Sequence, residues 1–167
     1  MTTVSDIMTR GVRSMSPSDT VTFAAQAMDE LNVGVIPVCQ GDTVVGMVTD
    51  RDILVRGIAQ QLDPETTTLA DVMSANVRCA REDDDVDQLL DEMAESQIRR
   101  MPVVDDQERL IGIVSLGDVA VKTGDDDVTS ALGDISAPSE PDRSGGSQAG
   151  GASRTGSAPG QAGRTAR

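Results

Sequence analysis

The chain has 167 residues, with 28 acidic side chains against 14 basic ones, no histidine and a single aromatic residue. Without histidine, a Ser-His-Asp or Cys-His nucleophile and any histidine-ligated zinc or haem are excluded. One aromatic residue argues against binding single-stranded nucleic acid on stacked aromatic platforms. The net charge of −14 argues against a duplex-binding surface, because phosphate contacts need a basic face.

The apolar segments and the cysteines of the sequence predict where in the cell the protein is located. The start of the chain contains no apolar signal core, and no apolar run is long enough to cross a bilayer. We therefore expect a soluble, cytoplasmic protein that does not bind membranes. Cys39 and Cys79 are too few for a disulfide framework. They are interpreted as small buried hydrophobes, with a redox-responsive pair as the alternative.

The chain carries one pattern twice. Val4-Ser5-Asp6-Ile7-Met8 recurs as Leu69-Ala70-Asp71-Val72-Met73, and Pro37-Val38 recurs at the same offset as Pro102-Val103. One residue is then inserted, so that Gly46-Met47-Val48-Thr49 meets Gly112-Ile113-Val114-Ser115 at an offset longer by one. Such a repeat indicates two copies of one structural unit.

In the first repeat, a helical lead-in over 4–8 precedes a strand over 12–15. Turn and N-cap residues at 18–20 then open a helix, whose spacing predicts a buried face of Val21, Ala24, Ala25, Met28 and Leu31. Residues 35–39 and 44–49 are predicted strands joined by a turn at Gly41-Asp42. Asp50 opens the last helix.

The second repeat follows the same order, with a helix over 86–96, strands over 101–104 and 110–115 around a turn at 105–109, and a helix from Leu116. A single unit of about 60 residues is marginal alone, so two units are expected to pack sheet to sheet and share a core. We predict an α/β fold of two pseudo-symmetric β-α-β-β-α domains, over 1–62 and 63–124.

The remaining residues differ in composition. Residues 125–135 are predicted to form a short closing helix. The segment over 136–167 consists mostly of Gly, Ala, Ser and Pro, and it contains no Val, Ile, Leu, Met or Phe. Such a segment cannot bury enough apolar surface to offset the entropy of ordering it, so we expect a disordered tail.

The acidic run over 82–85 raises the question of a metal site. It lacks the alternating spacing, central glycine and closing glutamate of an EF-hand loop. It directly precedes a predicted helix, where acids cap the free N–H groups and complement the dipole. We interpret the run as a cap and predict no metal site.

Each repeat resembles a cystathionine-β-synthase (CBS) domain, and the tandem resembles a CBS pair, also called a Bateman module. The likeness rests on the Asp-Ile/Val-Met opening, the apolar-Pro-Val strand and the motif Gly-h-h-[Ser/Thr]-x-x-Asp, where h is apolar, and it spans about residues 3–122. The motif stands as 46–52 and again as 112–118. The sequence as a whole is similar to those of small stand-alone bacterial CBS-pair proteins, including hypoxic response proteins.

The chemistry of the motif suits a nucleoside. Thr49 and Asp52, or Ser115 and Asp118, lie three residues apart at a helix start, so their side chains face the same way. A carboxylate accepts hydrogen bonds from ribose hydroxyls, and the neighbouring hydroxyl binds sugar or phosphate. A helix cap is the alternative interpretation of the same pair. The glycine of the motif allows close approach of a neighbouring strand.

The resemblance also implies an apolar slot for adenine and places basic residues at phosphate. In the first repeat the slot residues are Val12, Arg13, Val33, Gly34 and Val35; in the second they are Val77, Arg78, Ile98, Arg99 and Arg100. By likeness to the γ subunit of AMP-activated protein kinase, Arg99 and Arg100 face the phosphates of a ligand held by Thr49 and Asp52. The site on Ser115 and Asp118 would see only Gly34 and Val35, so we predict unequal sites. The alternative is that the two arginines are an exposed pair on an acidic surface; Arg51 and Arg56 could also supply charge.

The resemblance predicts a sensor. It implies binding of an adenine ligand (AMP, ADP, ATP, NAD or S-adenosylmethionine), with no cofactor required, no catalytic residues, a homodimer and an unknown regulated protein. Binding would shift a conformational equilibrium that a partner reads. The alternatives are a ligand-free scaffold acting by dimerisation, a carboxylate-based phosphohydrolase and a thiol switch through the two cysteines.

Overall fold

The structure is a computed structural model that describes residues 1–123. The predicted closing helix over 125–135 and the predicted tail over 136–167 lie outside the described residues. No helix within 1–123 is both long and apolar enough to cross a membrane.

The two repeats supply matching elements in the same order, except that strand β5 of the second repeat has no counterpart strand in the first. The first contributes α1 (Val4–Ile7), β1 (Thr9–Arg10), α2 (Val21–Leu31), β2 (Val35–Gln40), β3 (Thr43–Thr49) and a last helix that runs through α3 (Asp50–Asp52), η1 (Ile53–Gly57) and η2 (Ile58–Gln60). The second contributes α4 (Leu69–Val72), β4 (Ser74–Ala75), β5 (Ala80–Arg81), α5 (Val86–Ser96), β6 (Arg100–Val104), β7 (Leu110–Ser115) and α6 (Leu116–Thr123). In each repeat, the predicted long helix, the hairpin and the helix that follows the hairpin are confirmed.

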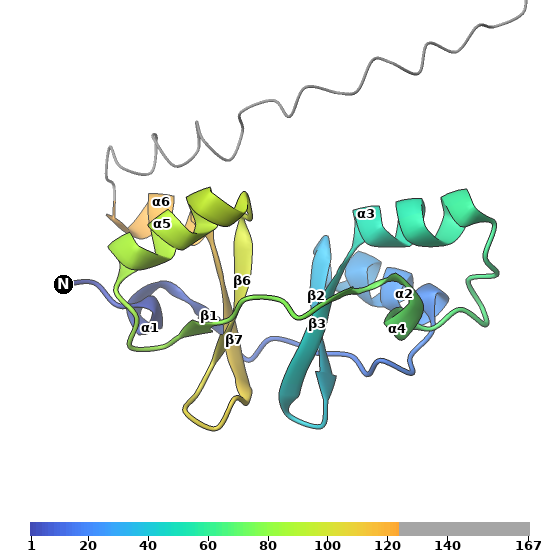
Figure 1. The fold of residues 1–167 in the computed structure, drawn as a ribbon, viewed down its shortest axis with the longest axis horizontal. Helices are drawn as coiled ribbons and strands as arrows, with labels where there is room; N and C mark the ends of the chain where they lie inside the picture. The colour runs from blue at the N-terminus through green and yellow to red at the C-terminus, as the bar shows by residue number, and fades with distance from the viewer. Residues whose placement is uncertain (124–167) are drawn as a thin grey trace, which may run out of the picture. The chain divides into compact units, whose positions relative to one another are not determined.

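Two sheets face each other at the centre of residues 1–123, and the helices lie outside them (Figure 1). One sheet has the strand order β2-β3-β4, the other β1-β7-β6-β5. Helices α2, α3 and α4 lie beside the first sheet, and α1, α5 and α6 beside the second. The backbone N–H of Leu110 donates to the carbonyl of Asp42 at 2.9 Å and joins the two hairpins. The predicted α/β fold of two pseudo-symmetric domains packed sheet to sheet is confirmed.

The buried residues form two cores, one in each repeat, instead of the single shared core that was expected, and the two cores are interlaced. Val4, Ile7 and Met8, at the start of the chain, are buried in the core of the second repeat, beside Val86 and Met101. The equivalent residues Leu69 and Val72 are buried in the core of the first repeat, together with Val21 and Ile36. Each lead-in helix therefore completes the core of the opposite repeat. The boundary between residues 62 and 63 stays a prediction, because packing crosses it in both directions.

Backbone hydrogen bonds explain why the lead-in helices cross over. The first free N–H groups of α1, at Val4 and Ser5, donate to the carbonyls of Asp84 and Glu82 at 3.0 and 2.8 Å. At the equivalent place, those of Leu69 and Ala70 in α4 donate to Asp19 and Pro17 at 2.9 and 3.0 Å. A helix start has N–H groups without intrahelical partners, and here the loop before the long helix of the opposite repeat satisfies them.

A cation secures the other end of each lead-in helix. Arg56 Nη1 donates to the carbonyls of Val72 and Met73 at 3.1 and 3.0 Å. Lys122, at the equivalent position of the second repeat, donates from Nζ to the carbonyls of Asp6 and Ile7 at 3.1 and 3.5 Å. Positive groups at a helix C-terminus are favourable because the free carbonyls carry partial negative charge.

The motif glycines make close approach possible, as predicted. A Cβ atom on Gly46 would lie 2.6 Å from the carbonyl oxygen of Ser74, and one on Gly112 would lie 2.6 Å from that of Thr9. The approaching strands, β4 and β1, directly follow the lead-in helices. Only glycine leaves room for both crossings.

Two expectations about the first repeat are wrong. The predicted strand over 12–15 is absent; only Met15 bridges to Val38, because the chain turns at Gly11 (φ 70°) after β1 pairs with β7. In α2, Ala25 and Leu31 are exposed and Ala27 is buried instead. Ala25 lies one residue beyond Ala24, about 100° around the helix from the buried face.

The acidic run before α5 acts as a cap, as predicted: the side chain of Asp85 accepts a hydrogen bond from the N–H of Asp87 at 2.9 Å.

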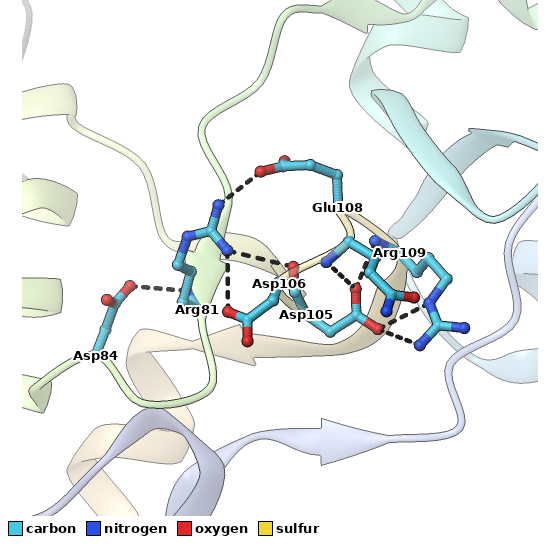
Figure 2. A network of polar contacts seen from close by, with 7 residues as sticks. Arg81, Asp84, Asp105, Asp106, Glu108 and Arg109 are labelled. Carbon is cyan, nitrogen blue, oxygen red and sulfur yellow. Dashed lines mark hydrogen bonds and ion pairs between the residues drawn. The ribbon is translucent and has the colours of Figure 1, made fainter.

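The turn over 105–109 contains the inserted residue, and a polar network holds it (Figure 2). Asp105 accepts from the backbone N–H of Arg109 at 3.0 Å and from its guanidinium at 2.8 Å, while Arg81 pairs with Glu108 at 2.6 Å. The hydrogen bonds from Arg109 lower the pKa of Asp105.

Candidate functional site

Two clefts lie where the repeats meet. The first, here called the Thr49 cleft, has a volume of about 350 Å³ and is lined by Val35, Met47, Thr49, Asp52, Ser74, Val77, Arg78, Ser96, Ile98, Arg99, Arg100 and Pro102. The second, the Ser115 cleft, has a volume of about 500 Å³ and is lined by Thr9, Arg10, Gly11, Val12, Arg13, Leu31, Asn32, Val33, Gly34, Val35, Ile36, Arg100, Ile113, Ser115 and Asp118. Both volumes lie in the range of small-molecule sites.

Every residue that the sequence predicted for a site lines one of these clefts. The arrangement crosses between repeats: Thr49 and Asp52 face the slot residues of the second repeat, and Ser115 and Asp118 face those of the first. A molecule in either cleft would thus contact both repeats. Whether these residues bind a nucleotide stays a prediction.

A second set of lining residues, which was not predicted from the sequence, also comes as repeat equivalents. Thr9 and Ser74, Leu31 and Ser96, and Met47 and Ile113 occupy matching positions in the two clefts. The register of the repeat was the available signal, because it relates the two members of each pair. Leu31 is exposed at the end of α2 because it forms part of a cleft wall rather than the core.

The motif side chains are fixed by reciprocal capping. The backbone N–H of Asp52 donates to Thr49 Oγ1 at 3.0 Å, and that of Thr49 donates to Asp52 Oδ2 at 3.0 Å. The same pair of bonds joins Ser115 and Asp118 at 3.2 and 2.8 Å, and Ser115 Oγ also donates to Asp118 Oδ2 at 2.6 Å. This arrangement is a capping box, so each motif pair does form a helix cap.

Capping and ligand binding are compatible in this geometry. At each site the cap employs one carboxylate oxygen, Oδ2, and the aspartate still lines its cleft. The remaining oxygen of Asp52 lies 3.7 Å from Arg56 Nη1, the group that also holds the end of α4. The cap therefore holds the carboxylate in one orientation at the cleft wall. Arg51 lines neither cleft.

The basic residues correct one expectation. The Ser115 cleft was expected to see only Gly34 and Val35 opposite its motif, yet Arg10 and Arg100 line it as well, beside the predicted Arg13. Each cleft is therefore lined by three arginines. The inequality of the sites cannot rest on the number of cations, because Arg100, on the strand between the clefts, reaches both.

The partners of the arginines differ between the clefts. In the Ser115 cleft, Arg10 pairs with Glu82 at 3.0 Å, and Arg13 pairs with Glu30 at 3.3 Å and lies 5.7 Å from the ring centre of Phe23. In the Thr49 cleft, the guanidinium groups of Arg78, Arg99 and Arg100 are exposed. Within residues 1–123 those three groups form no ion pair or hydrogen bond.

Acidic side chains and the two thiols are the other groups to consider in the described part of the chain. Residues 1–123 contain no group of three or more Cys, Asp or Glu side chains that could hold a metal ion. Both cysteines are free, and burial raises the pKa of Cys39 and that of Cys79. A raised pKa lowers the thiolate fraction, and the thiolate is the reactive form.

Comparison with known proteins gives a consistent result. The CBS domain family matches residues 4–57 and again residues 69–122. Hypoxic response protein 1 of Mycobacterium tuberculosis is 40% identical over 121 residues, which are 72% of this chain and 84% of that protein. A crystal structure of Hypoxic Response Protein I with two coordinated zinc ions covers 72% of this chain and 98% of its own at 39% identity and a TM-score of 0.67.

Two further solved structures contain ligands. CBSX2 in complex with AMP is 30% identical, covers 74% of this chain and 96% of its own, and gives a TM-score of 0.66. The CBS domain pair of MJ0100 in complex with 5′-methylthioadenosine and S-adenosyl-L-methionine is 30% identical, covers 74% of this chain and 97% of its own, and also gives 0.66.

Proposed function

Because the chain belongs to the CBS domain family, we propose that it is a regulatory module that binds an adenine nucleotide in the clefts between its repeats. One observation carries the proposal: each capped hydroxyl–carboxylate pair faces a wall supplied by the opposite repeat. The AMP bound to CBSX2 and the adenosine derivatives bound to MJ0100 support the ligand class.

The Thr49 cleft provides a group for each part of the nucleotide. Asp52 accepts from the ribose hydroxyls. Val77, Ile98 and Met47 supply aliphatic walls for adenine, which suits a chain with almost no aromatic residues. The exposed arginines attract phosphate, and guanidinium forks match its geometry.

A regulatory effect follows from the crossed arrangement. A ligand in either cleft contacts elements of both repeats, so its affinity depends on how the repeats sit against each other. Binding shifts that equilibrium by the difference in affinity between the two arrangements. The clefts are assigned no catalytic step, since their acidic side chains act as caps and ribose ligands. The cytoplasmic location stays a prediction.

The test is stabilisation by ligand. Differential scanning calorimetry suits this chain, because it has no Trp or Tyr and millimolar nucleotide absorbs in the far ultraviolet. AMP, ATP, NAD, S-adenosylmethionine and adenosine are compared at millimolar concentration, where a ligand at a hundred times its Kd adds about 2.7 kcal/mol. Asp52→Asn with Asp118→Asn should abolish the shift, and Asp91→Asn, on the exposed face of α5, should keep it. If no adenine ligand shifts the transition, the scaffold function replaces this one.

The scaffold function has its own supporting observation. Leu54, Val55 and Ile58 are large exposed apolar residues on one face of the last helix of the first repeat. In the second repeat, α5, which is the equivalent of α2, has an acidic exposed face with Asp87, Asp91, Glu92 and Glu95. A homodimer would bury the apolar face of the first repeat. Leu54→Glu with Ile58→Glu should then give monomers in sedimentation equilibrium, and Val121→Glu, at the position equivalent to Val55, should not.

A further inference from the structure

Two residues belong to both clefts, Val35 and Arg100. They are repeat equivalents and stand at the first positions of β2 and β6. Each pairs across its hairpin with the hydroxyl residue of its own motif: Val35 with Thr49, and Arg100 with Ser115. The junction between the clefts is thus built from one position of the repeat, used twice.

The repeat breaks its symmetry at this junction. The first repeat places an aliphatic side chain there and the second a guanidinium, so a single cation is available to two clefts. The other basic residues lie in one cleft each: Arg78 and Arg99 in the Thr49 cleft, Arg10 and Arg13 in the Ser115 cleft.

The side chain of Arg100 is free to serve either cleft. It is exposed, and its guanidinium makes no hydrogen bond or ion pair with any residue in 1–123. A guanidinium is a rigid planar fork that binds a phosphate through two parallel N–H groups. When the fork points into one cleft, its charge is withdrawn from the other.

We propose that Arg100 couples the two clefts negatively. A phosphate-bearing ligand in one cleft takes the Arg100 guanidinium, and a second such ligand then binds more weakly than it binds to the same cleft alone. Linkage makes the effect reciprocal, whichever cleft fills first. The inference rests on the proposed function, because it requires that the clefts accept phosphate-bearing ligands.

The coupling can be separated from a mere difference between the sites. Asp118→Ala leaves only the Thr49 cleft competent, and Asp52→Ala leaves only the Ser115 cleft, so calorimetric titration with AMP gives two single-cleft association constants. For independent clefts, the overall constant for the doubly loaded wild-type protein equals their product. The coupling factor is the ratio of that product to the measured overall constant. If an alanine variant folds poorly, the asparagine variant at the same position replaces it.

The wild-type protein should show a coupling factor of about 10 with AMP, on the scale of one charge-assisted hydrogen bond. With adenosine, which has no phosphate, the factor should be about 1. Arg100→Gln, measured in all three backgrounds, should bring the factor for AMP to about 1. Val35→Arg, which gives each repeat its own junction cation, should do the same without loss of affinity.

Other outcomes overturn the proposal. A factor of about 1 for AMP in the wild type, or a factor below 1, contradicts negative coupling. A factor that persists in Arg100→Gln shows repulsion between the two phosphates rather than a shared cation. If neither AMP nor adenosine binds, the proposed function fails and the coupling fails with it; if adenosine and AMP bind without coupling, only the coupling fails.

Discussion

The Thr49 cleft and the Ser115 cleft have the same backbone arrangement and the same number of arginines, but they differ in their other wall residues and in the partners of those arginines. Both are built on a capped hydroxyl–carboxylate pair, a glycine crossing and a lead-in segment from the opposite repeat. At the position where the first repeat has Gly34, beside the carboxylate of Asp50, the second has Arg99, beside Leu116. The two repeats therefore share the residues that set the backbone geometry of the clefts. They differ in the residues that form the cleft walls.

Ion pairing widens the difference. Arg10 and Arg13 are held by glutamates at the Ser115 cleft, whereas Arg78 and Arg99 have no such partners within residues 1–123. A guanidinium already paired to a carboxylate must give up that contact to bind phosphate. The inequality predicted from the sequence therefore has a different cause, the availability of cations rather than their number.

The largest effect is expected where the two repeats depend on each other most. Leu69→Ala and Ile7→Ala should each lower the free energy of unfolding by about 2–5 kcal/mol, since both side chains are fully buried. Urea titration measures the loss, with exposed Leu62→Ala as the control. Hydrogen exchange should then speed up in β2 and β3 for Leu69→Ala, and in β6 and β7 for Ile7→Ala. Loosening of each variant's own repeat instead would contradict the interlaced cores.

The glycine crossings should be equally intolerant in both repeats. Gly46→Ala and Gly112→Ala should each cost about 1–3 kcal/mol of unfolding free energy, since the new methyl group meets a backbone oxygen. Gly117→Ala is the matched control: its Cβ would lie 3.6 Å from Ser115 Oγ, an ordinary contact, and alanine favours the helix. Calorimetric transition temperatures measure the loss of stability. A loss at only one of the two glycines would contradict the predicted equivalence of the two crossings.

The arginine comparison predicts a smaller, ligand-specific effect. Arg78→Ala, measured in the Asp118→Ala background, should weaken AMP binding about tenfold. Arg10→Ala, in the Asp52→Ala background, should weaken it less than about threefold, because Arg10 is already committed to Glu82. Adenosine affinity should change in neither case. Equal losses at the two clefts would mean that pairing does not govern the availability of these cations.

The stability that the turn of the second hairpin contributes should fall in acid. Hydrogen bonds from Arg109 lower the pKa of Asp105, so its contribution is present above the unfolded-state pKa of about 3.9 and is lost as the pH falls through the folded-state value. In urea titrations, Asp105→Asn should be slightly less stable than wild type at pH 6. The difference should shrink as the pH falls below about 4. Asp91→Asn is the control, and a difference that does not vary with pH would exclude the carboxylate as its source.

The smallest effect concerns the cysteines, which are not repeat equivalents. Because burial raises the pKa of both thiols, each should react slowly with iodoacetamide at pH 7.5, and the buried Cys39 more slowly than the half-buried Cys79. Peptide mass spectrometry follows the two rates. Rapid, paired oxidation of both residues would instead favour the thiol switch.

Much of the candidate site was predictable because its residues lie close together in sequence. Thr49 and Asp52 share a helix start, and spacing alone places them on one side of it. Leu31 shows where such reasoning fails: helical periodicity assigned it to the core, yet the structure places it in a cleft wall. Periodicity identifies a face of a helix but cannot distinguish a core from a cleft.

The sequence by itself determined the two repeats, their helices and hairpins, and the two capped motifs, because these features depend on local spacing and on residues a few positions apart. Only the tertiary structure placed α1 in the core of the second repeat and α4 in that of the first. It alone brought Arg100 between the two clefts and gave Arg10 and Arg13 their glutamate partners. Those features depend on contacts between segments far apart in the chain, such as the one between Lys122 and Asp6, and no local pattern encodes which cation meets which carboxylate.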